Sequence, residues 1–192
     1  MCRFPADDAF IGDEIKLIER TLKAETPFLG LCLGAQLLCR AMGTRVYKHP
    51  EEETEIGYYP LRPTKAGEDW AKSYGAKWPR AVYHWHREGF DLPKGAELLA
   101  EGETFLHQAF RLGQKTLALQ FHPEVTHTVQ GKVILNRFVL DICQAKPDWV
   151  MTGYVQEAVE RIRAQVGDEE VILGLSGGVD SSVAAALIHR AI

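Results

Sequence analysis

The chain has 192 residues, of which 46% are hydrophobic and 25% charged, and its formal net charge is −4. This composition is ordinary for a globular protein, and the length suits one domain with part of a second. Charges of both signs are interspersed without a basic stripe for nucleic acid, and no apolar run approaches the ~18–20 residues that span a bilayer, so neither partner is expected.

The first quarter of the chain predicts a helix followed by a strand–turn–helix unit. Residues 11–25 predict an amphipathic helix that ends before Pro27, because four apolar residues fall on one face: Ile11, Ile15, Ile18 and Leu22. The stretch FLGLCLG (28–34) predicts a short buried strand and a glycine turn. Residues 35–42 then predict a helix closed by Gly43.

The middle of the chain predicts strands around one irregular excursion. Residues 46–63 predict strands with turns at Pro50, Gly57 and Pro60, and the polar residues 64–80 predict an irregular surface segment. Four further strands are expected, the last two joined by a turn at Gly113-Gln114: residues 81–86, 96–102, 104–113 and 115–122.

The last third of the chain predicts a domain boundary. Residues 126–144 predict an amphipathic helix with four inward positions, Val133, Ile134, Phe138 and Ile142. Residues 145–153 contain Pro147 and Gly153 and predict a linker. A helix (154–166), a strand (170–175) and a final loop and helix follow. We therefore predict an N-terminally incomplete α/β domain over 1–144 and the C-terminally incomplete opening βα unit of another over 154–192.

Cys32 is the first candidate for chemistry. It lies between Gly30 and Gly34, where a strand meets a helix, which is the arrangement of a nucleophile on a tight turn. The helix N-terminus would lower the pKa of the thiol, and the amide of Leu33 would donate to an oxyanion. A buried packing cysteine is the alternative. The four cysteines show no paired spacing, which favours a reduced, cytoplasmic compartment, and the chain start lacks the pattern of a signal peptide.

His122 and Glu124 supply the partners that such a cysteine needs. They are two residues apart at the end of the apolar strand in LQFHPE, so His122 could take the thiol proton while Glu124 orients the imidazole. A satisfied surface histidine is the alternative.

Together with Cys32, these residues resemble the class I glutamine amidotransferases. The resemblance implies a flavodoxin-like mixed sheet flanked by helices and glutamine hydrolysis through a thioester. It also implies that Gln36 helps to hold glutamine.

Two features depart from that family. The start MCRFPADDAF holds no glycine turn to supply the second oxyanion donor, so one donor and an edge of the sheet are expected to be missing and activity to be impaired. His84 and His86 share one side of a strand, which leaves a metal pair and polar residues lining the cleft as interpretations. The sequence favours the second and assigns no metal ligand.

The stretch SGGVDSS (176–182) is the second candidate for chemistry. It offers backbone amides, hydroxyl groups and a helix N-terminus to an anion, and Asp180 is expected to cap the helix or to lie near a magnesium ion. An ordinary glycine turn is the alternative. The pattern resembles the pyrophosphate loop of the N-type ATP pyrophosphatases, which have an adenine-nucleotide α-hydrolase-like fold. The resemblance implies ATP as substrate, with Mg²⁺ and no prosthetic group, bound at Ser176, Gly177, Gly178, Val179, Asp180, Ser181 and Ser182.

The order of the two motifs and the amino-acid sequence of residues 121–192 resemble those of the glutamine-hydrolysing GMP synthase family. That resemblance implies that ammonia from glutamine reacts with ATP-activated XMP to give GMP, in a parent protein that forms a homodimer. Residues 83–100 and 107–113 look more like stand-alone class I amidotransferases. Two alternatives therefore stay open: a stand-alone amidotransferase or γ-glutamyl peptidase, and a non-catalytic interaction protein that pairs through sheet edges.

Overall fold

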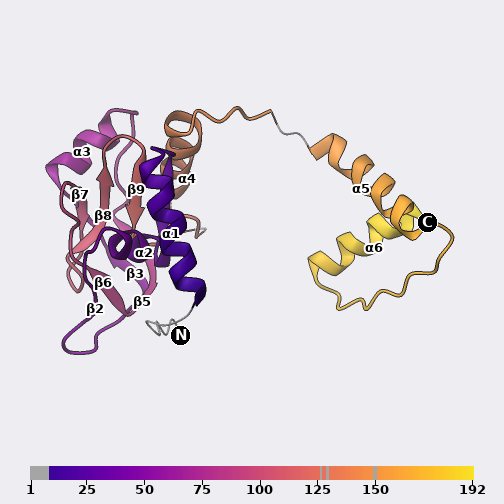
Figure 1. Ribbon diagram of the computed structural model, residues 1–192, viewed down its shortest axis with the longest axis horizontal. Helices are drawn as coiled ribbons and strands as arrows, with labels where there is room; N and C mark the ends of the chain where they lie inside the picture. Colours follow the sequence, from indigo (N-terminus) through magenta and orange to yellow (C-terminus); the bar gives the residue numbers. More distant parts are fainter. Residues whose placement is uncertain (1–8, 126, 129, 149–150) are drawn as a thin grey trace. The chain divides into compact units, whose positions relative to one another are not determined.

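The computed structural model describes residues 9–125, 127–128, 130–148 and 151–192, and the chain forms two compact units, Met1–Lys146 and Pro147–Ile192 (Figure 1). The first unit holds a five-stranded mixed sheet in the order β1-β9-β8-β7-β4. Its strands are β1 (Phe28–Leu31), β4 (Arg62–Pro63), β7 (Glu97–Glu101), β8 (His107–Leu112) and β9 (Thr116–Leu119). Strands β1 and β9 are parallel, and the other pairs are antiparallel.

Two pairs of strands stand beside this sheet. Strand β2 (Val46–Lys48) pairs with β6 (Glu88–Phe90), and β3 (Glu55–Pro60) pairs with β5 (Ala81–His86), both antiparallel. Gly57 and Pro60 were expected in turns, but both lie within β3, where Gly57 has a φ of 117°. The expected turn at Pro50 and the hairpin between Leu112 and Thr116 are confirmed.

Helices cover both faces of the five-stranded sheet. Helices α1 (Ala9–Lys23) and α2 (Leu33–Ala41) pack on one face, where Ile18 and Leu38 join Phe110 and Ala118 in a buried cluster. The predicted apolar face of α1 is confirmed, since Ile11, Ile15 and Leu22 pack against the same cluster. Alternation along β9 sends Ala118 to this face and its two neighbouring leucines to the other.

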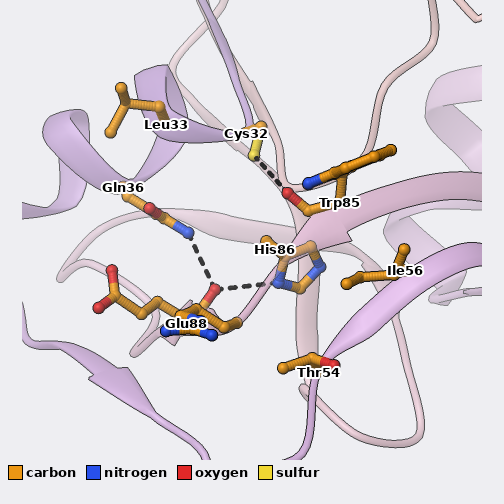
Figure 2. Close-up of a pocket in the computed structure, with 9 residues that line it drawn as sticks. Cys32, Leu33, Gln36, Thr54, Ile56, Trp85, His86 and Glu88 are labelled. Carbon is orange, nitrogen blue, oxygen red and sulfur yellow. Dashed lines mark hydrogen bonds between the residues drawn. The ribbon is translucent and has the colours of Figure 1, made fainter. Parts of the chain in front are cut away.

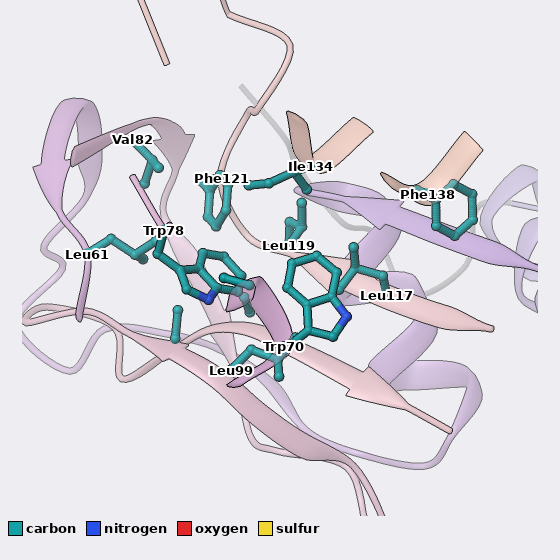
Figure 3. Packing of buried hydrophobic residues seen from close by; sticks show 13 residues of the cluster. Leu61, Trp70, Trp78, Val82, Leu99, Leu117, Leu119, Phe121, Ile134 and Phe138 are labelled. Atoms are coloured by element: carbon teal, nitrogen blue, oxygen red, sulfur yellow. The ribbon is translucent and has the colours of Figure 1, made fainter. Parts of the chain in front are cut away.

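The opposite face of the sheet carries the larger cluster, in which Leu117 and Leu119 pack with Trp70, Trp78 and Phe121 (Figure 3). The irregular surface segment expected over 64–80 is therefore wrong. Residues Lys65–Lys72 form helix α3, and both tryptophans are buried. Two wide aromatic rings supply enough apolar contact to hold a short, otherwise polar helix on the sheet.

The helix expected over 126–144 begins later than predicted. It consists of α4 (Gly131–Asn136) and a π-helical turn, η1 (Arg137–Ile142). Ile134 and Phe138 are buried as expected, and Ile142 packs at the edge of the cluster. Val133 was expected to point inward, but it is 40% exposed.

The second unit consists of two helices, α5 (Met151–Val166) and α6 (Val179–Ala191), joined by an extended segment. Among the described residues of this unit, Ala158, Val159 and Ala191 are the buried apolar ones. Arg163 donates to the carbonyls of Ala191 and Arg190 at the end of α6, at 2.9 and 3.3 Å. The strand expected over 170–175 is absent from the described part of the unit, because no neighbouring strand is there to accept its hydrogen bonds.

Candidate active site

Cys32 lies directly after β1, where the chain turns into α2. Its backbone has φ 47° and ψ −101°, a left-handed conformation that is strained for a residue with a side chain. Its amide donates to Leu119 O at 2.8 Å, which extends the parallel pairing of β1 with β9 by one residue. The thiol is half-buried. The expectation of a tight turn between strand and helix at this position is confirmed.

The glycines around Cys32 serve different purposes. A Cβ atom on Gly30 would come within 2.8 Å of backbone atoms of Gly34 and Ala35, so only glycine allows the strand and the helix to approach this closely. A Cβ atom on Gly34 would meet nothing within 4 Å. Gly30 is therefore a packing requirement of the turn, whereas Gly34 leaves open space at the start of α2.

His122 and Glu124 form a pair. His122 Nδ1 and Glu124 Oε1 are 2.7 Å apart, and the His122 amide donates to Tyr83 O at 2.9 Å. Both residues follow β9, just as Cys32 follows its parallel neighbour β1. The carboxyl ends of adjacent parallel strands meet at one edge of a sheet, so the fold brings the cysteine and the pair to the same edge.

A pocket opens beside Cys32 (Figure 2). Leu33, Ile56 and Trp85 give it apolar walls, while Gln36, His86 and Glu88 supply polar groups. The side chains of Ile56 and Trp85 are 56% and 60% exposed, so they form the rim. The pocket is thus mostly apolar with a few fixed polar groups, as in sites for small ligands.

Gln36 lines this pocket and is buried, where it forms part of a hydrogen-bond network. Its Nε2 donates to Glu88 O at 2.9 Å and to Gln120 Oε1 at 3.2 Å. Gln120 Nε2 in turn donates to Cys32 Sγ at 3.7 Å, and Cys32 Sγ lies 3.9 Å from Trp85 O. The sequence analysis missed Gln120, although it stands two residues before His122 in the same motif.

His84 lies beneath the pocket, whereas His86 lines it, so the expectation of polar residues at the cleft holds for His86 alone. Both are buried and contact Glu55 Oε2, at 3.3 Å from His84 Nδ1 and 3.0 Å from His86 Nε2. Burial lowers the pKa of His84 to about 4, against the opposite effect of Glu55. Burial would raise the pKa of Glu55, but its close contacts with His86 and His84 hold that pKa below its usual value. The sequence analysis missed Glu55.

The terminal loop, residues 176–182, belongs to the second unit and is exposed. Gly177 has a φ of 81°, and Gly178 caps α6. Asp180 lies in the first turn of α6, so the expectation that it caps the helix is wrong. The hydroxyls of Ser181 and Ser182 donate to Gly178 O at 3.0 and 2.8 Å, and Ser176 Oγ is 3.0 Å from Ser181 Oγ.

None of the helices in the described part of the chain has the length and apolar character that a membrane span requires.

Two protein families match the chain. The family Glutamine amidotransferase class-I matches residues 5–142, and the family NAD synthase matches residues 151–192. The division between the two compact units, after Lys146, falls between these two matches.

The curated relatives that we compared are named glutamine-hydrolyzing GMP synthases. The chain is 45% identical over 170 residues to a glutamine-hydrolyzing GMP synthase of Neisseria gonorrhoeae, an alignment that covers 86% of this chain and 32% of the relative. The same enzyme of Polynucleobacter necessarius is 47% identical over 176 residues, with 86% of this chain and 33% of the relative covered. The chain thus spans about a third of the length of these relatives.

Solved structures share the fold. A glutamine amidotransferase from Thermotoga maritima is 28% identical with a TM-score of 0.54, over 95% of this chain and 67% of that one. A glutamine amido transferase from Methylobacillus flagellatus is 27% identical with a TM-score of 0.55, over 76% of this chain and 58% of that one. The expected fold class, a mixed sheet flanked by helices, is confirmed.

Proposed function

Because the chain belongs to the class-I glutamine amidotransferase family, we propose that its first unit hydrolyses glutamine at Cys32. The main support is the strained turn at Cys32, which holds the thiol at one edge of the sheet. The His122–Glu124 pair follows the adjacent parallel strand at the same edge. Such strain is maintained at sites where a reactive group must project from the backbone.

The reaction divides into two steps. In the first, His122 takes the proton of Cys32, and the thiolate attacks the side-chain amide carbon of glutamine. The amide N–H of Leu33 donates to the oxyanion, and His122 returns the proton to the leaving nitrogen, which departs as ammonia. In the second, water attacks the thioester, and glutamate and the Cys32 thiol are released. Glu124 stabilises the imidazolium in both steps.

Substrate binding is proposed for the pocket beside Cys32. Gln36 lines it, Gly30 lets β1 and α2 approach closely and so positions the amide of Leu33 for the substrate, and Gly34 leaves open space at the start of α2. The sequence-based question of a second oxyanion donor concerns residues 1–8, which lie outside the described residues. Because the reaction needs a thiol at Cys32, we assign it to a reducing compartment, the cytoplasm.

The test of glutaminase activity is ammonia release from glutamine by Cys32→Ser. We expect kcat to fall at least about 10³-fold, because the serine hydroxyl is a far weaker nucleophile at neutral pH. The control is Cys143→Ser, since Cys143 is exposed directly after η1, in a different part of the unit. A Cys32→Ser protein that hydrolyses glutamine at the rate of the control would refute the assignment.

For the longer protein we propose glutamine-dependent GMP synthesis. Ammonia from the first unit would react with XMP activated by ATP and Mg²⁺, with the ATP pyrophosphate at residues 176–182. The relatives' names and the NAD synthase match support this proposal. In a parent protein supplied with XMP, ATP and Mg²⁺, Cys32→Ser is expected to abolish GMP formation from glutamine but not from ammonium. We also propose that the parent is a homodimer.

A stand-alone glutamine amidotransferase or γ-glutamyl peptidase is the second candidate. The similarity to solved glutamine amidotransferases and the exposed apolar rim of the pocket favour it. Equilibrium binding of ATP to the parent protein distinguishes the two candidates, because only the synthase requires it. GMP formation in the preceding assay would exclude the second candidate as the main activity.

A further inference from the structure

Three electron-pair donors converge beneath the pocket, on strands β3 and β5. Glu55 Oε2 lies 3.3 Å from His84 Nδ1 and 3.0 Å from His86 Nε2, and the two nitrogens are 2.9 Å apart. The three side chains are 1–2% exposed. In the register of the two strands Glu55 pairs with His86, and His84 lies two residues away on the same face. The backbone therefore fixes all three donors.

Too few protons are available for this triangle of contacts. His86 Nδ1 lies 3.0 Å from Glu88 O, which can only accept, so the ring proton of a neutral His86 belongs on Nδ1. Its Nε2 then directs a lone pair at the Glu55 carboxylate. A proton on His84 Nδ1 could be shared between Glu55 Oε2 and His86 Nε2, but it leaves no proton between His86 Nε2 and Glu55 Oε2. Lone pairs of these two atoms would then face each other across 3.0 Å, in a buried position. A cation between them removes this repulsion.

We propose that Glu55, His84 and His86 bind a divalent first-row transition metal ion. Ligand atoms about 2.0–2.2 Å from one ion are roughly 2.8–3.1 Å apart at octahedral angles and roughly 3.3–3.6 Å apart at tetrahedral angles, and the observed separations are 2.9–3.3 Å. Two imidazoles and one carboxylate suit Zn²⁺ or Fe²⁺, whereas Mg²⁺ and Ca²⁺ prefer oxygen alone. Three protein ligands leave a coordination position for water.

The groups around the triangle support the ligands. The Nδ1–H of His86 donates to Glu88 O, which fixes the tautomer that presents Nε2 to the ion. Gln108 Nε2 donates to Glu55 Oε2 and to Phe105 O, both at 2.9 Å, and holds the carboxylate in place. Such outer hydrogen bonds accompany metal-binding histidines and carboxylates generally.

The ion would also order the pocket of Cys32. His86 lines that pocket, and Glu88 O accepts from both His86 and Gln36. A metal that fixes the His86 ring thereby also fixes the Glu88 carbonyl, to which Gln36 is hydrogen-bonded. This is a structural role, because the three ligand side chains are buried and the Cys32 thiol lies outside the triangle.

The experiment measures metal content and needs no glutamine, so its failure leaves the proposed glutaminase untouched. The tag-free 192-residue chain is stripped with a chelator, incubated with Zn²⁺ or Co²⁺, dialysed and analysed. We expect about one ion per chain and visible d–d absorption with Co²⁺. Glu55→Gln and His84→Gln should each weaken binding at least about 100-fold. His107→Gln is the matched control, because His107 hydrogen-bonds Phe90 O on a neighbouring strand and should leave binding unchanged.

Two results would overturn the proposal. The first is a wild-type chain that retains no ion after dialysis, which would mean that a protonated His86 supplies the cation. The second is binding that survives Glu55→Gln but is lost in His49→Gln, which would place the ion at the exposed group His49, Glu51 and Glu53. Should a variant fail to fold by circular dichroism, X-ray absorption of the zinc-loaded wild type decides, with two imidazole ligands and no sulfur expected.

Discussion

At the scale of single residues, the backbone of Cys32 determines what the site can do. Its φ of 47° and ψ of −101° strain any residue that carries a Cβ atom. We expect Cys32→Gly to unfold at a higher urea concentration than Cys32→Ala, with a difference of about 1 kcal/mol after the greater unfolded-state entropy of glycine is deducted. Equilibrium urea unfolding of both variants measures this. Equal or greater stability of the alanine variant would mean that the turn relaxes.

Glu124 permits a second prediction at this scale. The glutamine side chain of Glu124→Gln keeps an acceptor for His122 Nδ1 but loses the charge that stabilises the imidazolium. We expect kcat for glutamine hydrolysis to fall about 10²–10⁴-fold with little change in KM. Glu103→Gln, at an exposed carboxylate elsewhere in the unit, is the control. A change in KM alone would instead make Glu124 a substrate-binding residue.

Single residues also mark the limit of what the sequence could predict about the site. The pairing of His122 with Glu124 follows from their spacing at a strand end, and the structure has them 2.7 Å apart. Glu55 ends an acidic run, 51–55, that is typical of an exposed loop. Only its pairing with His86 across β3 and β5 buries it. Contacts between strands that are distant in sequence carry no local signal, so Glu55 could not be predicted, whereas Gln120 had a local signal in its position two residues before His122.

At the scale of elements, the junction of β1 and α2 depends on close backbone contact. A Cβ atom on Gly30 would lie 2.8 Å from the backbone of Gly34 and Ala35, which cannot move without shifting the helix. We expect Gly30→Ala to lower the free energy of unfolding by about 2 kcal/mol or more. Gly34→Ala should be neutral or stabilising by up to about 1 kcal/mol, because its Cβ meets open space in a helix.

Comparison of these two variants distinguishes a steric clash at Gly30 from a general effect of replacing glycine by alanine. Both changes add the same methyl group within one motif, and thermal or urea unfolding measures both. Similar destabilisation by the two would contradict the geometry, since only Gly30 faces backbone atoms. Gly34 is a control for stability alone, because its neighbours form the pocket beside Cys32.

Helix α3 shows why a short helix was not predicted from the sequence. It has eight residues, too few for a clear helical period. Its start is set by Thr64, whose Oγ1 accepts from the amide of Gly67 at 3.1 Å and donates to Leu98 O at 2.6 Å. Trp70 and Trp78 were the available signal, because two tryptophans in a polar stretch need an apolar surface to cover.

The segment 170–175 shows the converse case, a strong local pattern without its partners. Its apolar residues predict a strand, yet Ile172 is 98% exposed and no described strand lies beside it. Strand propensity reflects packing on neighbours more than backbone preference. Local composition therefore predicted the apolar character of the segment but not its pairing.

At the scale of the whole molecule, the fold of the first unit was predictable because its elements alternate in a regular way. A helix, a buried strand, a glycine turn and a second helix dictate an α/β layer, and the Gly113 hairpin dictates that β8 and β9 are neighbours. The detached pairs β2–β6 and β3–β5 were not predictable, because each joins segments far apart in the chain. Those pairs carry the polar residues beneath the pocket.

The two units should differ sharply in stability on their own. The first contains two hydrophobic clusters on opposite faces of a five-stranded sheet, whereas the second has 46 residues, of which the described part buries three apolar side chains, Ala158, Val159 and Ala191. So small a core supplies less free energy than the conformational entropy of ordering two helices requires. We expect a chain of residues 1–146 to unfold cooperatively and a peptide of residues 147–192 to show low helicity without a cooperative transition. Circular dichroism during heating measures both. A cooperative transition in the peptide would show that helices α5 and α6, with the contacts of Arg163, suffice as a folding unit.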